Sequence, residues 1–259
     1  MNTVDILKEA VGVLRGGGVI LYPTDTVWGI GCDATNPEAV ARVYAIKRRS
    51  EAKSLVLLAA DLDMVARYVR AIPNIAIDLV EVNDRPMTLI YPDAICGTAP
   101  EAGAGGQAPA AATTIEGALP PTIPRGSRAT DIAFGSVPPS AGRSEERLGA
   151  TIASEKAVRQ TGSKYQLAWN TVAEDGSVGI RIPLPGFWRD LVARLGRPLV
   201  STSANISGEP TPRRFTEIPE EIRAAVDFVV PPSLERGSTG AASQIIKVGL
   251  GGEVEIIRA

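Results

Sequence analysis

Short apolar runs alternate along most of the chain with segments whose apolar residues recur at helical spacing. Strands are predicted at residues 19–22, 54–60, 86–91, 177–182, 198–201, 244–248 and 253–258. Helices are predicted at residues 4–14, 187–195 and 219–225, with further helices starting behind Asn36-Pro37 and Asp61, and with Thr3 as the cap of the first. Strands interleaved with helices favour an α/β fold in which helices pack on a sheet.

This pattern breaks between about residues 94 and 166. The stretch is rich in Ala, Gly, Pro, Ser and Thr, and it holds few large apolar residues. Such a composition buries too little surface to offset the conformational entropy of the chain. We therefore predict one domain over residues 1–259, interrupted by a flexible insertion at about 94–166 rather than joined to a second folded domain.

Composition narrows the class of protein. The chain of 259 residues is long enough for a substantial core, and its net charge of −2 provides no global basic field for nucleic acid, although a local basic patch stays open. Two cysteines without metal-ligand spacing favour a reducing, cytoplasmic setting. We expect neither a signal peptide nor a membrane span, since the sequence has no apolar run of the required length.

The chain contains no histidine. This absence excludes histidine general bases, Ser-His-Asp triads and histidine-ligated zinc sites. Ser203 is accordingly not expected to be a covalent nucleophile, because no histidine can activate it and no GxSxG elbow surrounds it.

Three cations, Lys47, Arg49 and Lys53, follow a predicted helix and lead into an apolar strand. One interpretation is a solvated helix end, where cations suit the helix dipole. The other is a phosphate clamp, because arginine offers phosphate a planar fork and lysine a point charge. Glycine-rich phosphate loops are not found, so a nucleotide site here would be of another type.

A hydroxyl-rich segment, Ser201-Thr202-Ser203-Ala204-Asn205, follows a later strand. It is typical of a turn, but its hydroxyls and amide would also suit phosphate or ribose. Arg181 lies in an apolar strand and needs a carboxylate partner, from the protein or from a ligand. Glu174 and Asp175 are candidates, although their context also fits a turn.

Several of these segments resemble the YrdC-like family, whose best-known members are threonylcarbamoyl-AMP synthases. The resemblance covers nearly everything outside the predicted insertion, in matching order and spacing. It rests on Tyr22-Pro23-Thr24-Asp25-Thr26-Val27-Trp28-Gly29, Lys47-x-Arg49 with Lys53-Ser54-Leu55, Pro86-Met87-Thr88-Leu89-Ile90, Gly179-Ile180-Arg181-Ile182-Pro183 and Ser201-Thr202-Ser203-Ala204-Asn205-Ile206-Ser207-Gly208.

The resemblance implies a twisted, largely parallel or mixed sheet with flanking helices around a deep, positively charged cavity. It implies an enzyme, a nucleotidyltransferase that converts L-threonine, bicarbonate and ATP into L-threonylcarbamoyladenylate and pyrophosphate, with Mg²⁺ brought by ATP. The product feeds the threonylcarbamoyladenosine modification of tRNA, so tRNA and downstream threonylcarbamoyl-transferase proteins are further candidate partners.

Site residues carry over by position in the matching motifs. The threonine side would comprise Thr24, Arg181, Ser201 and Ser243. The nucleotide side would comprise Lys47, Arg49, Lys53, Ser177, Ser203, Asn205, Thr211 and Arg258. No general acid or base and no protein metal ligand is implied; Lys47 and Arg49 would position the reactants and stabilise their charge.

Three points stay open at this stage. The insertion would form a lid, lie outside the fold, or reflect a damaged reading frame. A competing function is an RNA- or tRNA-binding protein without synthase activity, which the acidic balance of charge disfavours. A third is a carbamoyl-transfer domain of hydrogenase maturation, whose usual zinc-finger domains have no counterpart in this sequence.

Overall fold

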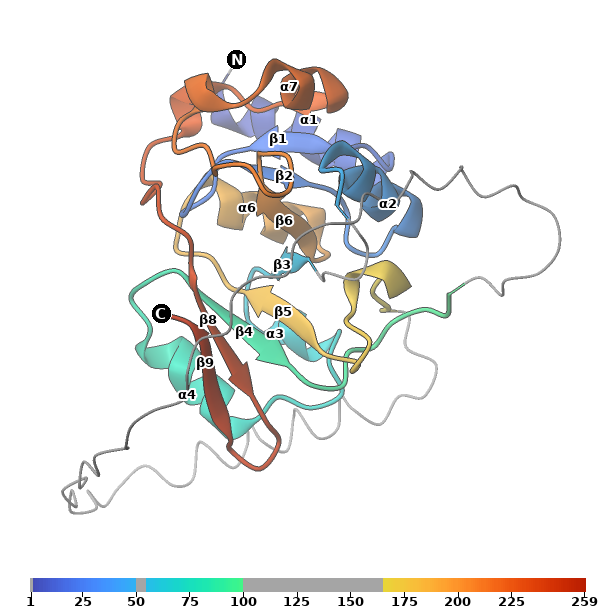
Figure 1. Ribbon diagram of the computed structural model, residues 1–259, viewed down its shortest axis with the longest axis vertical. Coiled ribbons are helices and arrows are strands. Elements are labelled where there is room, and N and C mark those ends of the chain that lie inside the picture. The colour runs from blue at the N-terminus through green and yellow to red at the C-terminus, as the bar shows by residue number, and fades with distance from the viewer. Residues whose placement is uncertain (1, 50–54, 100–164) are drawn as a thin grey trace, which may run out of the picture.

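The computed structural model describes residues 2–49, 55–99 and 165–259. Within these ranges one nine-stranded sheet runs through the molecule (Figure 1). Its strands, in spatial order, are β7 (Phe228–Val229), β1 (Ile20–Tyr22), β2 (Gly29–Gly31), β6 (Leu199–Ser203), β3 (Val56–Leu58), β5 (Val178–Arg181), β4 (Met87–Tyr91), β8 (Gln244–Val248) and β9 (Val254–Arg258).

The sheet is mixed. β7 pairs with β1, β3 with β5 and β4 with β8 in parallel, whereas the other neighbours are antiparallel. A mixed α/β sheet with flanking helices is the predicted fold class, which is thereby confirmed.

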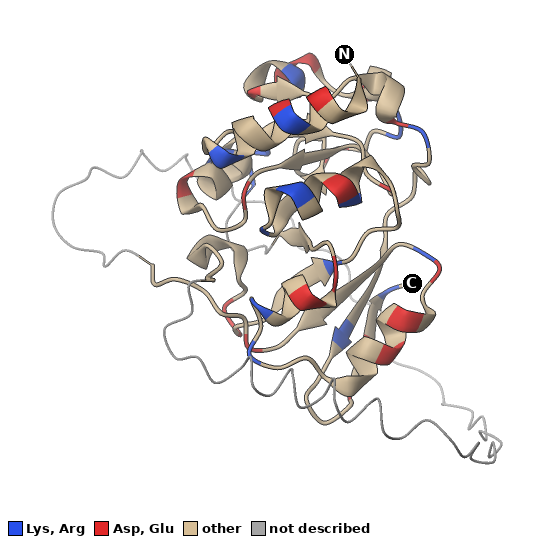
Figure 2. Cartoon of the chain, turned by 180° about the vertical axis from the view of Figure 1, so that it is seen from behind, with Lys and Arg blue, Asp and Glu red and all other residues tan. Residues whose placement is uncertain are grey.

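The helices of the described chain lie along this sheet. They are α1 (Thr3–Arg15), α2 (Pro37–Ile46), α3 (Leu62–Ala66), α4 (Asn74–Val82), α6 (Phe187–Leu195) and α7 (Glu220–Ala225), with short 3-10 turns at η1 (Trp169–Thr171), η2 (Phe215–Glu217) and η3 (Pro232–Leu234). α1 packs against α6 and β1. Basic and acidic residues are interspersed over the outer helices (Figure 2), in keeping with a net charge near zero.

Strand register assigns side chains to the two faces of the central sheet. Leu57 pairs with both Val200 and Ile180, so these three apolar side chains share one face, where they are buried. The neighbouring residues Ser201 and Arg181 point to the opposite face. The sheet therefore separates an apolar face from one that carries the candidate polar groups.

Helix caps agree with prediction at two of three positions. The Asn36 side chain accepts a hydrogen bond from Ala39 N at the start of α2, and that of Asp61 caps α3. At α1 the predicted cap Thr3 is wrong. Asn2 caps the helix instead, because its side chain accepts a hydrogen bond from Asp5 N at 2.9 Å.

Two elements were not predicted. β7 is only two residues long and pairs with β1, so it has no periodicity of its own. α4 begins behind Pro73 without a side-chain cap, and Ala76 is its one fully buried residue. The start of this helix therefore carries no capping signal in the sequence.

Residues 100–164, which hold most of the predicted insertion, lie outside the described ranges, so the insertion stays a prediction. The two ends of the chain that flank it pair with each other, since Gly97 N donates to Leu167 O and Leu167 N to Ile95 O. No helix in the described ranges combines the length and apolar character that crossing a bilayer requires.

Candidate functional site

The end of α2 carries the first two predicted cations. Arg49 N donates to Tyr44 O and Arg48 N to Ala45 O, both at 3.0 Å, which are the two hydrogen bonds of a Schellman motif. Arg48 occupies its left-handed position with φ 48°, where glycine is usual. The motif reverses the chain just after Lys47, the C-terminal cap of the helix.

Lys47 is buried against the hydroxyl-rich segment. Its ammonium donates to Ser203 O and, at 2.8 Å, to Asn205 O, and the side chain is almost fully enclosed. The interpretation of Lys47 as a solvated helix end is therefore wrong. Two motifs separated by 156 residues in sequence are in direct contact.

This enclosure changes the titration of the cation. Burial, and secondarily the positive charge of Arg49, lowers the pKa of Lys47 to about 8. Burial also lowers the pKa of Arg49. Lys47 is thus a cation held by carbonyls rather than by an anion, a situation that an anionic ligand would relieve.

Asn205 is fixed in one orientation. Its amide nitrogen donates to Ile206 O at 2.9 Å and to Glu209 O at 2.7 Å. Its Oδ1 atom is buried and has no hydrogen-bond partner among the described residues. A buried acceptor left open in this way is costly unless a ligand or water donates to it.

Strand β6 extends further than predicted. Thr202 and Ser203, assigned to a turn by their composition, belong to the strand beyond the predicted end at Ser201, because they pair with β2. Glycines permit this: a Cβ on Gly31 would lie 2.6 Å from Val200 O. A Cβ on Gly29 would lie 3.3 Å from Ser201 Oγ and 3.5 Å from Thr24 Cγ2, so the predicted residues Ser201 and Thr24 flank one glycine.

Arg181 has its carboxylate partner in Asp25. The two form a buried ion pair, and Arg181 Nη2 lies 3.3 Å from Thr26 Oγ1. Leu184 N donates to the second carboxylate oxygen of Asp25 at 3.1 Å. Asp25 was quoted within a motif but not predicted as a site residue; the signal was a carboxylate beside Thr24, needed by a buried arginine.

Glu174 and Asp175 are not the partners of Arg181. Asp175 instead accepts from Ser177 N at 3.0 Å and from the Ser177 hydroxyl, and it pairs with Lys247 at 3.0 Å. These bonds lower the pKa of Asp175 to about 2, the Ser177 hydroxyl contributing most. The alternative reading of this segment as a turn is confirmed, and Ser177 precedes β5 at the end remote from Arg181.

Ser243 and Arg258 lie together at β8 and β9. The Ser243 hydroxyl shares a 2.8 Å hydrogen bond with that of Thr88, and its carbonyl accepts from Arg258 Nε at 2.9 Å and Nη2 at 2.6 Å. Arg258 joins this group from the edge strand. Burial lowers its pKa.

The described contacts thus divide the predicted residues into three groups. One gathers at the ends of α2 and β6, one around Gly29 and Arg181, and one at β8 and β9. Thr211 is exposed and joins none of them through a described contact. Lys53 lies outside the described residues, and the charge of the expected cavity stays a prediction.

Tyr22 is a further residue that the sequence did not single out. Its phenol lies over Gly31 and close enough to Ser201 to form a hydrogen bond. Burial, the largest influence, raises the pKa of Tyr22, so its hydroxyl stays protonated. The hydroxyl donates to Val200 O at 3.5 Å, so its oxygen can accept from Ser201 and fix that side chain.

Fold and site together define an α/β protein that gathers cations, hydroxyls and an amide where its strands end, the arrangement of a binder of small anions. A family model described as "Telomere recombination", that of Sua5, YciO and YrdC proteins, matches residues 12–111 and 148–259. The chain belongs to the Sua5/YciO/YrdC family, as its motifs predicted.

Several relatives are named threonylcarbamoyl-AMP synthase, and two of them show the range of similarity. The protein of Xanthomonas euvesicatoria pv. vesicatoria is 30% identical over 94% of this chain and 91% of its own length. That of Halorhodospira halophila is 41% identical over 33% of this chain and 46% of its own. Among solved structures, P. abyssi Sua5 complexed with L-threonine has a TM-score of 0.59 at 20% identity, covering 96% of this chain and 52% of that one.

Proposed function

We propose that this chain is a threonylcarbamoyl-AMP synthase, which makes L-threonylcarbamoyladenylate and pyrophosphate from L-threonine, bicarbonate and ATP. The observation that carries the proposal is the contact of Lys47 with the carbonyls of Ser203 and Asn205, which unites two of the family's motifs in one place. The relatives of matching length support a synthase over an RNA-binding protein.

The nucleotide side begins at this contact. Two of the three N–H groups of Lys47 are engaged by carbonyls, so the third can reach a phosphate oxygen. Arg49 follows the turn of Arg48 and adds a planar fork. The unpartnered Oδ1 of Asn205 would accept a hydrogen bond from a hydroxyl of the nucleotide. The proposed nucleotide-binding residues also include Ser203, Ser177, Thr211, Arg258 and Lys53.

The threonine side begins at Arg181. Asp25 engages one of its terminal nitrogens and Thr26 is near the other, which orients the guanidinium and leaves N–H groups for the threonine carboxylate. Ser201 and Thr24 lie so close to Gly29 that a Cβ there would already touch both, so the glycine lets these two proposed threonine contacts approach the strand. Ser243 would add a hydroxyl from β8.

The proposed reaction depends more on compensating the negative charge of its reactants than on a general acid or base. The threonine amine adds to bicarbonate to give a carbamate and water. A carbamate oxygen attacks the α-phosphorus of ATP, the bond to the β-phosphate breaks, and pyrophosphate leaves. Bicarbonate, the carbamate, ATP and pyrophosphate are all anionic, so fixed cations and alignment lower the barrier. A chain without histidine can carry this out.

Mg²⁺ is proposed to arrive with ATP. In the described ranges no three acidic, cysteine or histidine side chains gather to hold a metal ion, and Asp25 is already paired with Arg181. These residues do not fit a protein-held ion, and we assign no ligand to it. Bound Mg²⁺ commonly relies on substrate phosphates and waters. A cytoplasmic location, tRNA and downstream transferases belong to the same proposal.

The test is product formation. Full-length protein incubated with ATP, L-threonine and bicarbonate should yield threonylcarbamoyladenylate by mass spectrometry, and omitting threonine or bicarbonate should abolish it. Lys47→Met should reduce the yield by about 10-fold or more, because a charged contact to phosphate is lost. Lys8→Met, which removes an exposed lysine of α1, is the matched control and should leave the yield unchanged. Absence of product from the unaltered chain would refute the proposal.

A further inference from the structure

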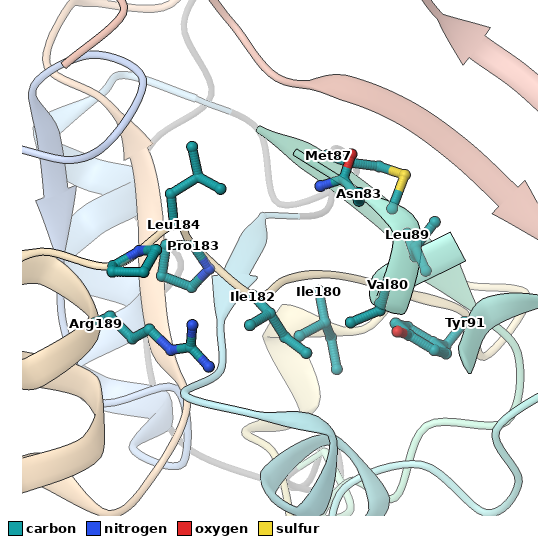
Figure 3. Close-up of a pocket in the computed structure, with 11 residues that line it drawn as sticks. Val80, Asn83, Met87, Leu89, Tyr91, Ile180, Ile182, Pro183, Leu184 and Arg189 are labelled. Carbon is teal, nitrogen blue, oxygen red and sulfur yellow. The ribbon is translucent and has the colours of Figure 1, made fainter. Parts of the chain in front are cut away.

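A hollow lies on the face of the sheet opposite to Arg181 and Ser201. It has a volume of about 220 Å³ and is bounded by α4, by β4 and β5, and by the segment that leads from β5 into α6 (Figure 3). Ile180 lines it, whereas the next residue along β5, Arg181, points to the face of the candidate site. The hollow is therefore separate from the proposed threonine and ATP site.

Most of its wall is apolar. The side chains are those of Val80, Met87, Leu89, Ile180 and Ile182. A cavity of about 150 Å³ with such a lining is large enough for benzene. This hollow therefore has room for a ring or a branched chain of similar size that carries additional polar atoms.

Tyr91 places a hydroxyl in this apolar surrounding. The side chain is only 1% exposed, and the hydroxyl has no hydrogen-bond partner in the part of the chain that the structure describes. Figure 3 shows the hydroxyl directed into the hollow, toward Ile180. Burial raises the pKa of the phenol, so it remains a donor. The hydroxyl oxygen is accessible from the hollow, where a ligand oxygen would accept its hydrogen bond.

Arg189 enters from the opposite side. Its Nε donates to Ala60 O at 3.0 Å, which fixes the stem, and no carboxylate of the described chain lies within ion-pair distance of it. In Figure 3 its guanidinium extends toward Ile182 and faces Tyr91 across the two isoleucines. The terminal nitrogens are thus available to an anion, and the guanidinium prefers carboxylates.

We propose that this hollow is a binding site for a small organic acid. The carboxylate of the ligand pairs with Arg189, its apolar body covers Ile180 and Ile182, and an oxygen at its far end accepts from the Tyr91 hydroxyl. The pairing of a cation, an apolar middle and a hydroxyl donor selects this class over uncharged or basic molecules.

The site is connected to the candidate active site by two contacts. Leu184 lines the hollow, and its N–H donates to Asp25, the partner of Arg181. A ligand that moves Leu184 therefore acts directly on the ion pair that orients the proposed threonine residue. This coupling rests on the proposed function, whereas binding of the acid does not.

Calorimetric titration of the full-length protein, without ATP or threonine, tests the site. The probe 4-hydroxyphenylacetate has a carboxylate, a ring and a distal oxygen; 2-(4-hydroxyphenyl)ethanol lacks the carboxylate, and phenylacetate lacks the distal oxygen. We expect 4-hydroxyphenylacetate to bind at least about 10-fold more tightly than the alcohol, because a charged hydrogen bond is added. We expect it to bind about 2- to 10-fold more tightly than phenylacetate.

Two variants assign these differences to residues. Arg189→Met should abolish the preference for the acid over the alcohol, whereas Arg194→Met, an exposed arginine of the same helix, should preserve it. Tyr91→Phe should equalise 4-hydroxyphenylacetate and phenylacetate without lowering the melting temperature, since its hydroxyl has no described partner to lose.

The proposal fails if none of the three probes binds, or if the alcohol binds as tightly as the acid. It also fails if Tyr91→Phe leaves the probe preference intact. None of these readouts depends on synthase activity, so the fate of the site and that of the proposed function are separable.

Discussion

At the scale of single residues, the candidate site depends on charges removed from water. Lys47 is held by two backbone carbonyls rather than by a carboxylate, whereas Arg181 has Asp25. The first arrangement leaves net positive charge available to a ligand. The second is balanced within the protein and restricts the orientation of the guanidinium.

Affinity for ATP should therefore depend on the protonation of Lys47. Because its pKa in the folded protein is about 8, the free site loses a positive charge as the pH rises through that value. We expect the ATP dissociation constant, measured by calorimetry without threonine, to rise between pH 7 and pH 9. The Lys47→Met variant should bind ATP at least about 10-fold more weakly at pH 7, and its affinity should not change between pH 7 and pH 9. An affinity that is flat with pH in the unaltered chain would contradict this role.

The same pKa has a consequence for folding. Since unfolded lysine retains its proton to higher pH, the unfolded state binds more protons than the folded state above about pH 8. The contribution of Lys47 to the free energy of unfolding therefore rises with pH in that window, opposite in sign to its effect on ATP affinity. Urea denaturation of the unaltered chain and of Lys47→Met across this range measures the difference.

Asp25→Asn should be strongly destabilising, by about 3–5 kcal/mol, because it leaves the guanidinium of Arg181 buried without its anion. Replacing both partners, as in Asp25→Leu with Arg181→Met, should cost less than Asp25→Asn alone. Chemical denaturation checks both. A double variant less stable than the single one would show that the pair contributes more than mutual compensation.

The sequence singled out Arg181 because a charge is unusual in an apolar strand, whereas the site roles of Lys47 and Asn205 came from the resemblance of their motifs. Sequence reasoning did not reach the pairing of Arg181 with Asp25, which comes from a loop 156 residues earlier in the chain. Local spacing carries no information on such a partner, so the sequence offered only the nearby Glu174 and Asp175 as candidates, beside the interpretation of that segment as a turn, which is the correct one.

At the scale of elements, backbone geometry positions these groups. α2 ends in a Schellman motif that turns the chain between Lys47 and Arg49, and the glycines of β2 let β6 and Tyr22 approach closely. The sequence predicted the start of α2, since Asn36 and Pro37 are direct capping signals. It did not predict its C-terminal motif, because arginine rather than glycine occupies the left-handed position.

Arg48→Gly should accordingly raise the free energy of unfolding by about 0.5–1 kcal/mol, because glycine adopts the left-handed conformation without a Cβ penalty. Loss of the exposed pair with Glu221 should offset little of this gain. Thermal denaturation measures the effect. A decrease in stability would mean that the Arg48 side chain contributes more than the backbone strain costs.

At the scale of the whole molecule, the α/β class and the mixed character of the sheet were predicted, but the strand order was not. β6 lies between β2 and β3, and β4 between β5 and β8, so the sheet joins strands remote in sequence. Hydrophobic periodicity identifies strands and says nothing about their neighbours. The prediction that distant residues form one site came from the resemblance of their motifs to a known family, not from hydrophobic periodicity.

The predicted insertion also belongs to this scale. The family model skips residues 112–147, and the composition there predicts no packed core. Replacing these residues by a short Gly-Ser linker should change the free energy of unfolding by no more than about 1 kcal/mol, since loop closure depends weakly on length. ATP affinity should also be retained. A large loss of either, by calorimetry, would show that the segment is integral to the fold or site.

The central claim is that two groups of residues hold two different substrates in one pocket, and steady-state pyrophosphate release tests it most directly. Release should require ATP, L-threonine and bicarbonate together. Arg181→Lys, which keeps a charge for Asp25 but loses the planar fork, should raise the KM for threonine by about 10-fold with the KM for ATP nearly unchanged. Pyrophosphate released without threonine, or a variant that alters the KM for ATP instead, would contradict the account.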